Sequence, residues 1–143
     1  MSSTTPLSEP LTVVNVAAEG GASTAPYRNV MVSRVNDGCL RLSAFEGDYP
    51  WHAHPDSDEL FVVVEGRLVV EVEGGPVFEL GPWDTVTVPA GVVHRTRALP
   101  RAVNLTVERA DATTTFVDPP AAPAHAETSH VRSSRRARGR STE

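Results

Sequence analysis

Three histidines and one glutamate in the middle of the chain have the spacing expected of metal ligands. His52 and His54 are separated by one residue, so in an extended strand both imidazoles point the same way, roughly 7 Å apart along the chain. Glu59 follows a turn of Pro, Asp and Ser residues and opens a strand that can run back beside these histidines. His94 stands just after a tight Pro-x-Gly turn, at the start of another strand. Together these residues predict a site for a divalent first-row transition metal.

Each feature also has a plainer explanation. Two histidines beside a tryptophan could be ordinary half-buried polar groups, and the His52-x-His54 spacing alone is weak evidence for metal binding. The glutamate and the later histidine strengthen the metal interpretation. The two further histidines, His125 and His130, lie near the end of the chain, so every histidine of the central region belongs to one pattern.

Three imidazoles and one carboxylate that converge would fill four of the six positions of an octahedral ion and leave two for water, a substrate or dioxygen. An open position distinguishes a catalytic metal site from a structural one. The donor set suits one divalent ion of Fe, Mn, Ni, Co or Zn, and the sequence does not choose among them.

The elements that must position these residues are predicted to be β-strands. Short runs of Val, Leu, Phe and Thr are separated by Gly, Pro, Asp and Asn at near-regular spacing. The expected strands are Tyr27–Val35, Leu40–Phe45, Glu59–Glu65, Leu68–Glu73, Val77–Leu80, Thr85–Val88, His94–Arg97 and Val103–Glu108, with a turn at Glu65-Gly66 among others. No stretch shows a helical period. So many short antiparallel strands need closure to protect their edges, which indicates an all-β barrel or jelly roll.

The chain divides into three regions. Residues 1–26 are rich in Ser, Thr, Ala, Gly and Pro and are predicted to form an N-terminal arm that could contain an edge strand at Thr12–Val16. Residues 27–118 are the barrel. Residues 119–143 contain no Leu, Ile, Phe, Trp or Tyr, so burial cannot offset their ordering entropy and a disordered tail rich in Pro, Ala and Arg is expected.

Charge and composition exclude several classes of function. Residues 1–118 hold 16 acidic and 8 basic side chains, and this acidic body argues against nucleic-acid binding, which needs clustered basic residues. All 13 basic residues are arginines, so no lysine is present for a Schiff base or a Walker-type phosphate loop. The single cysteine, Cys39, allows no internal disulfide.

The chain carries no signal for a membrane or for secretion. A length of 143 residues with 40% hydrophobic and 22% charged residues is typical of one globular domain. No run approaches the ~18 to 20 apolar residues of a membrane span, and the N-terminus lacks the basic and apolar regions of a signal peptide. We therefore expect a cytoplasmic protein without membrane or nucleic-acid partners.

Two motifs of the sequence resemble those of the cupin superfamily, in particular the small single-domain cupins. They read Gly47-x4-His52-x-His54-x4-Glu59-x6-Gly66 and Gly81-x7-Pro89-x-Gly91-x2-His94. The resemblance covers about residues 27–118 and implies a jelly-roll β-barrel, a double-stranded β-helix, with a metal inside. It assigns the ligand roles to His52, His54, Glu59 and His94. It also implies a homodimer in which N-terminal strands are exchanged or packed together.

The resemblance leaves the activity open. Small cupins include dioxygenases, isomerases, cyclases and lyases, so the first hypothesis is a small-molecule metalloenzyme of one of these types. The alternative is a non-catalytic module that binds or senses a small ligand. A storage role is disfavoured, because a buried Glu59 among imidazoles would be costly without a cation to pair with it.

Strand alternation predicts part of the wall around the site. Thr96 shares the inward face of His94, and Phe61 shares that of Glu59. For the last expected strand, either the Val103, Leu105 and Val107 face or the Asn104 and Thr106 face lines the cavity, and the pattern does not decide between them.

Overall fold

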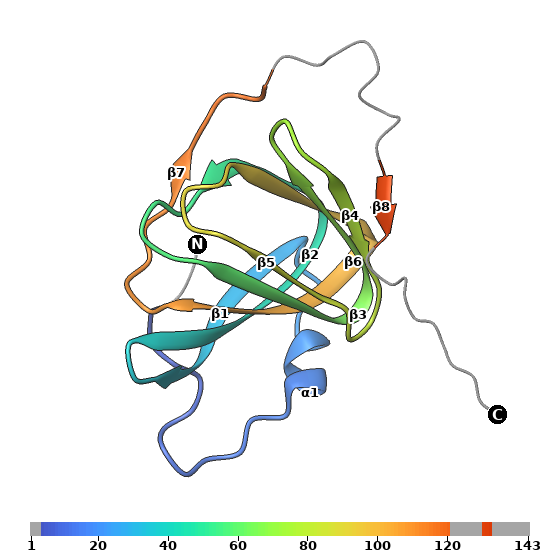
Figure 1. The fold of residues 1–143 in the computed structure, drawn as a ribbon. Helices are drawn as coiled ribbons and strands as arrows, with labels where there is room; N and C mark the ends of the chain where they lie inside the picture. The colour runs from blue at the N-terminus through green and yellow to red at the C-terminus, as the bar shows by residue number, and fades with distance from the viewer. Residues whose placement is uncertain (1–3, 121–129, 133–143) are drawn as a thin grey trace, which may run out of the picture.

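The computed structural model describes residues 4–120 and the backbone of residues 130–132. In these residues one short helix precedes eight strands, most of which curve into a barrel (Figure 1). The elements are α1 (Val16–Gly20), β1 (Tyr27–Val35), β2 (Gly38–Ala53), β3 (Glu59–Val72), β4 (Val77–Leu80), β5 (Thr85–Val88), β6 (His94–Arg109), β7 (Thr115–Phe116) and β8 (His130–Arg132). The predicted all-β jelly-roll barrel is confirmed.

Three long strands form the centre of the barrel. The sheet order is β1-β2-β6-β3-β4-β8, with β5 also paired to β3 and β7 to β2. All pairs are antiparallel except β4 with β8. Strand β6 therefore lies between β2 and β3, so the starts of β3 and β6 and the end of β2 can meet at one end of the barrel.

The long strands are continuous where the sequence predicts breaks. The prediction of a turn at Glu65-Gly66 is wrong, because β3 runs through both residues with a register shift against β6. Gly66 has a φ of +80°, a conformation that glycine adopts without steric cost. A β-bulge uses the same residue types as a turn, which is why the sequence pattern did not separate them.

The N-terminal arm differs from its prediction. No strand forms at Thr12–Val16; instead the Asn15 side chain accepts a hydrogen bond from the Ala18 N–H at 2.9 Å and caps α1. The arm meets the sheet earlier, where the Leu7 N–H donates to the Met31 carbonyl at 2.8 Å. The capping preference of asparagine therefore prevails over the β propensity of the valines around it.

The C-terminal region departs from its prediction in one place. His130–Arg132 form β8, parallel to β4, although the whole of 119–143 was expected to be disordered. The exposed edge of a sheet pairs with backbone groups and does not require apolar side chains. Residues 121–129 and 133–143 lie outside the described part of the chain. Within that part, no helix has the length and apolarity needed to cross a membrane.

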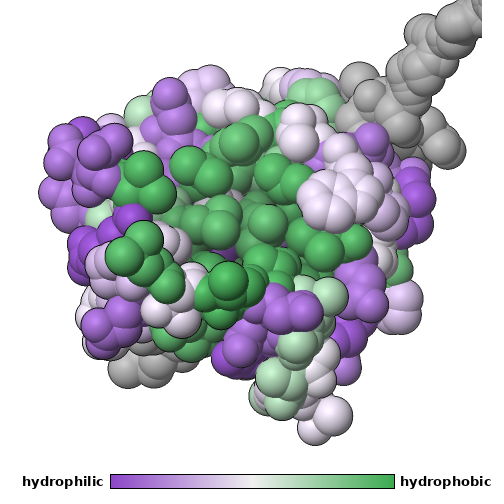
Figure 2. Space-filling model, turned by 90° about the horizontal axis from the view of Figure 1, so that it is seen from below, coloured by the Kyte–Doolittle hydropathy of each residue, from purple (hydrophilic) through white to green (hydrophobic). Residues whose placement is uncertain are grey.

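Apolar side chains pack on both sides of the barrel wall. One buried cluster, which includes Phe61, Leu68 and Leu80, fills the interior. A second lies on the outside of β1, β2, β3 and β6 and also contacts the arm. The apolar outer face consists of Val30, Val32, Leu40, Leu42, Ala44, Val64, Val103, Leu105 and Val107. Figure 2 shows a broad apolar area on the underside of the molecule, the side on which α1 and the arm lie in Figure 1.

The register shift in β3 beside Gly66 predicts unequal losses of unfolding free energy for two glycine substitutions. A Cβ at Gly66 would lie 2.1 Å from the Arg101 carbonyl oxygen, whereas one at Gly47, with a similar φ of +77°, would meet nothing within 4 Å. We expect Gly47→Ala to lose about 1 to 2 kcal/mol of unfolding free energy from left-handed backbone strain. Gly66→Ala should lose about 1 to 3 kcal/mol more because of the clash. Denaturant titration of both variants measures this, and equal losses would contradict the assigned bulge.

Candidate metal centre

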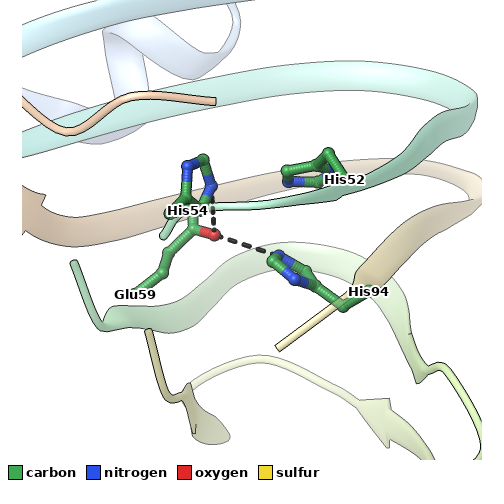
Figure 3. Close-up of side chains that lie close together, drawn as sticks. All are labelled: His52, His54, Glu59 and His94. Atoms are coloured by element: carbon green, nitrogen blue, oxygen red, sulfur yellow. Dashed lines mark hydrogen bonds and ion pairs between the residues drawn. The ribbon is translucent and has the colours of Figure 1, made fainter. Parts of the chain in front are cut away.

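Four side chains from three strands converge at one end of the barrel. His52 lies near the end of β2 and His54 directly after it, while Glu59 and His94 are the first residues of β3 and β6 (Figure 3). His52 and His94 are paired across the β2–β6 ladder. All four side chains are buried, and one ligand-type atom from each lies within 4.8 Å of the others. The structure therefore brings together the complete set that the sequence singled out.

One oxygen of Glu59 occupies the centre of this group. Its Oε1 lies 3.1 Å from His54 Nε2 and 3.2 Å from His94 Nε2. The third imidazole is close by, because the ring centroid of His52 is 4.3 Å from that of His94 and 4.9 Å from that of His54. The carboxylate and all three rings thus share one small volume.

The outer nitrogen of each ring is held by a backbone carbonyl. For His52, His54 and His94, the partners of Nδ1 are the carbonyl oxygens of Pro50, Thr113 and Val92, at 2.7, 3.0 and 3.0 Å. A carbonyl oxygen only accepts, so each Nδ1 carries a hydrogen and donates it. In the neutral rings the Nε2 lone pairs are then free to face the centre of the group. Metal-binding histidines in proteins are oriented in this way.

This arrangement fits a cation. Two Nε2 lone pairs and a carboxylate oxygen are all acceptors, so they can lie about 3 Å apart only if a proton or a metal ion sits between them. Within the described residues, the one polar partner of His54 Nε2 is this carboxylate oxygen of Glu59. Two donors on one ion with bonds of ~2.1 Å are at most ~4.2 Å apart, so small side-chain movements would close the shell.

Protons take the place of a cation in the metal-free chain. Burial disfavours charge on both His54 and Glu59, but their mutual attraction outweighs it, raising the pKa of His54 and lowering the pKa of Glu59. Burial and the neighbouring His94 lower the pKa of His52 to about 4, so this ring is neutral near pH 7. A metal ion would displace the proton of His54, as metals do when they bind histidine.

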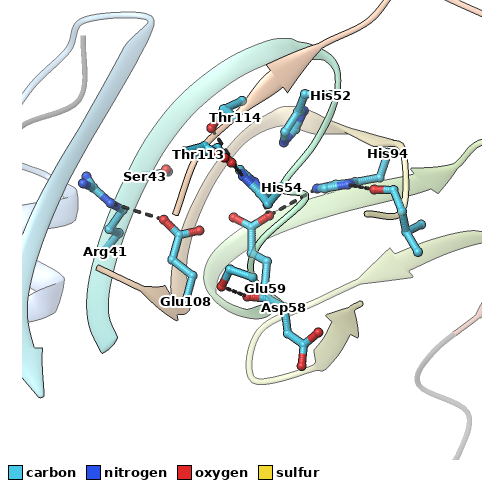
Figure 4. Close-up of polar contacts among 12 residues, drawn as sticks. Arg41, Ser43, His52, His54, Asp58, Glu59, His94, Glu108, Thr113 and Thr114 are labelled. Atoms are coloured by element: carbon cyan, nitrogen blue, oxygen red, sulfur yellow. Dashed lines mark hydrogen bonds and ion pairs between the residues drawn. The ribbon is translucent and has the colours of Figure 1, made fainter. Parts of the chain in front are cut away.

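Short hydrogen bonds hold the loops that carry the ligand-type residues. Asp58 accepts from the Ala90 N–H at 2.9 Å, and the Gly91 N–H donates to the His54 carbonyl at 2.9 Å. Asp56 accepts from the backbone N–H and the hydroxyl of Thr113. The carbonyl of Thr113 in turn holds His54 (Figure 4). The loops before β3, before β6 and after β6 are therefore tied together around the site.

A cavity of about 170 Å³ opens next to the four residues. Thr96 and Phe61 line it, as strand alternation predicts. The sequence left open which face of the last expected strand lines the cavity. In the structure Asn104 and Thr106 point inward, so the face of Val103, Leu105 and Val107 lies outside. The side chains along the cavity are Tyr27, Asn29, Arg41, Ser43, Phe45, Tyr49, His52, His54, Glu59, Phe61, Thr96, Asn104, Thr106, Glu108, Ala112 and Thr114.

Sequence reasoning missed Arg41 and Glu108. They face each other inside the barrel, with Arg41 Nε 3.5 Å from a Glu108 carboxylate oxygen. Burial and the nearby Glu59 carboxylate raise the pKa of Glu108 to about 7. The alternation of β2 carried the signal, because Leu40 and Leu42 must share one face and Arg41 the other.

The comparisons with known proteins agree with this fold. The sequence pattern of the cupin domain matches residues 42–103. The Bacillus subtilis (strain 168) protein YdbB is 42% identical over 104 residues, which cover 73% of this chain and 92% of YdbB. A cupin-2 domain protein of Shewanella frigidimarina has a similar structure, with a TM-score of 0.63 and 26% identity over 68% of this chain and 94% of that one.

A more distant structure, the DMSP lyase DddQ of Ruegeria pomeroyi, has a TM-score of 0.57 at 22% identity. It covers 64% of this chain, which in turn spans 52% of that protein, so the likeness concerns the fold. The jelly roll, the buried histidine and glutamate group and the YdbB match together lead to one conclusion. This chain belongs to the cupin family.

The central position of Glu59 predicts that its charge is needed to retain a metal. We expect Glu59→Gln to weaken metal binding at least tenfold, since an amide supplies no negative charge, while the barrel stays folded. Glu65→Gln, an exposed change on the same strand, is the matched control and should bind metal normally. Metal titration with elemental mass spectrometry of untagged protein measures both. Unchanged affinity in Glu59→Gln would remove this residue from the ligand set.

Proposed function

We propose that this cupin is a small-molecule metalloenzyme in which His52, His54, Glu59 and His94 hold one divalent transition metal. One observation carries the proposal. A buried carboxylate oxygen lies about 3 Å from two imidazole nitrogens whose outer nitrogens are already bonded to carbonyls, at the end of an interior cavity. Fe, Mn, Ni, Co and Zn all suit three imidazoles and one carboxylate.

The chemistry proposed is that of an oxygenase, an isomerase or cyclase, or a lyase. A bound ion would act as a Lewis acid or bind dioxygen at its remaining positions. The chain's own residues would bind and orient the substrate. Thr96, Thr106 and Asn104 offer polar groups from β6, while Phe61 supplies an apolar wall. Glu108 is a half-buried carboxyl group that lines the same cavity, placed to accept or donate a proton within the barrel.

The second candidate is a non-catalytic module that binds or senses a small ligand, because the same cavity could hold a molecule without converting it. Location in the cytoplasm and the lack of nucleic-acid and membrane partners stay predictions from the sequence.

Comparing the metal-loaded protein with a His94→Ala variant tests the enzyme proposal. Untagged wild-type protein should contain about one equivalent of a divalent metal, and the variant should lose it because a buried ligand is removed. Both proteins are then incubated with a mixture of small metabolites, with and without dioxygen, and the mixture is followed by mass spectrometry.

Depletion of a compound by wild-type protein and not by His94→Ala would support an enzyme, and its dependence on dioxygen would identify an oxygenase. A compound that is retained by the protein but not converted would favour the binding module. Absence of metal after incubation with each ion would overturn the metalloenzyme.

We also propose that two copies of the chain pair through the apolar outer face. Nine apolar side chains lie on the outside of four adjacent strands. The arm covers part of this face, since Val32, Leu42, Ala44 and Val103 are at most 4% exposed and the cluster packs with Val14 and Val16. The other five side chains are partly or fully exposed and form an apolar surface that a second copy would cover. Val107, 43% exposed, is the most accessible of them.

Val107→Arg places a charge on this face and should convert a dimer to a monomer in light scattering. Trp83→Arg, a change at a 71% exposed residue in the turn between β4 and β5, should leave the dimer intact. A wild-type monomer would contradict this pairing.

A further inference from the structure

The inner surface of the barrel is polar beyond the four metal-site residues. Arg41 and Ser43 of β2, Asn29 of β1 and Asn104 of β6 all line the cavity. Strand pairing places them side by side, since Ser43 is the ladder partner of both Asn29 and Asn104. The outside of these strands is apolar, so beside the cavity β1, β2 and β6 turn their polar residues inward, while the rest of the interior is apolar. A buried polar surface of this kind is costly unless something hydrogen-bonds to it.

Arg41 is the only cation among these added groups, and its side chain is 11% exposed. Its Nη1 donates to the Asn29 amide oxygen at 2.9 Å, and the Asn29 amide nitrogen donates to the Ser43 hydroxyl at 2.7 Å. A guanidinium has five N–H donors, so the bond to Asn29 and the contact with Glu108 engage only part of it. Asn29 also fixes its orientation. Arg41 is therefore a positioned donor beside the cavity.

Asn104 supplies an unmet acceptor. This residue is 2% exposed, and its Oδ1 has no hydrogen-bond partner within the described residues. Buried amide oxygens in proteins are almost always paired. Since Asn104 lines the cavity, a donor on a molecule inside the cavity would satisfy it.

The charges of the cavity favour an anion once a metal is present. A divalent ion and Arg41 together carry one more positive charge than Glu59 and Glu108 can neutralise. An excess charge in a buried site is unfavourable, and a ligand with one negative charge removes it. A carboxylate also matches the planar geometry of a guanidinium.

We propose that the cavity binds a small hydroxycarboxylic acid, whose carboxylate accepts from Arg41 and whose hydroxyl donates to Asn104 Oδ1. This inference rests on the proposed function, because the metal would contribute to the charge and bind the remaining oxygen atoms. The volume of about 170 Å³ limits the ligand. It is close to that of cavities that hold benzene, which corresponds to roughly six to eight non-hydrogen atoms.

Ligand analogues of similar size test the chemical class on the wild-type protein. Lactate, glycerate and 2-hydroxybutyrate, which have six or seven non-hydrogen atoms, are titrated calorimetrically into metal-loaded protein, beside lactamide and propionate. Lactamide lacks the negative charge of lactate, and propionate lacks its hydroxyl. We expect at least one hydroxy acid to bind, with lactate at least tenfold tighter than lactamide and several-fold tighter than propionate. Absence of binding by all three acids, or equal binding of lactate and lactamide, would overturn the proposal.

Two variants assign the binding to its residues. Arg41→Gln should weaken binding of the acid about ten- to a hundredfold, the loss typical of a hydrogen bond to a charged group. The matched control is Arg67→Gln, whose side chain is 47% exposed on β3 and which should bind as wild type does. Asn104→Leu should abolish the preference for lactate over propionate. Unchanged binding in Arg41→Gln would overturn the assignment of the carboxylate to Arg41. If that variant does not fold, the analogue series on the wild-type protein still tests the proposal.

Metal content measured on the same samples separates this inference from the proposed function. Protein that binds metal but none of the acids keeps the proposed function and loses this inference. Protein that binds no metal overturns the proposed function. If it still binds the acid through Arg41, the residue assignment remains and the contribution of the ion is excluded.

Discussion

The structure depends on one buried carboxylate oxygen. Glu59 Oε1 lies between the Nε2 atoms of His54 and His94, each of which is held from behind by a carbonyl. A charged group in a poorly solvated space is tolerated only with a compensating cation or proton. The loops at this end of the barrel are tied to one another by hydrogen bonds of Ala90 to the Asp58 carboxylate and of Gly91 to the His54 carbonyl, which keeps the acceptors close together. The fold thereby holds a binding site for positive charge.

The barrel provides this geometry through three long strands. Because β6 lies between β2 and β3, the end of β2 and the starts of β3 and β6 meet, and each supplies ligand-type residues. The strands remain continuous over this distance because they bend at register shifts, one of them beside Gly66. The segment after β6 then returns across the site, where the Thr113 carbonyl holds His54 and Thr114 lines the cavity.

Beside the cavity, β1, β2 and β6 carry polar residues on their inner face and apolar residues on their outer face. On β2, Leu40 and Leu42 lie outside while Arg41 and Ser43 lie inside. Elsewhere the interior is apolar, with Phe61, Leu68 and Leu80 in one buried cluster, as expected where apolar burial is the main favourable term in folding. The polar inner face beside the cavity is understandable if it serves a polar ligand, and the apolar outer face if it is covered by the arm and by another copy. The two proposals therefore explain the two faces of the same strands. The bound acid accounts for the polar inner face, and the pairing of two copies accounts for the apolar outer face.

Local sequence information was enough for the overall fold and for the group of four residues. Alternating apolar residues and turn-forming residues predicted β1, β4 and β5 with their observed bounds. Local sequence information was insufficient where two different structures are favoured by the same residue pattern. Glu65-Gly66 suits a turn or a bulge, and Asn15 followed by valines suits a strand or a helix cap. Pairing with a distant segment decides the first case, and a side-chain hydrogen bond decides the second.

The sequence by itself determined the all-β class, the two cupin motifs and the identity of His52, His54, Glu59 and His94, because these depend on residue types at short separations. Only the tertiary structure decided which face of β6 lines the cavity and that Arg41, Asn104 and Glu108 gather there. Alternation divides a strand into two faces, but it does not say which of them points inward. That choice is made by the closure of the barrel, through contacts between residues far apart in the chain.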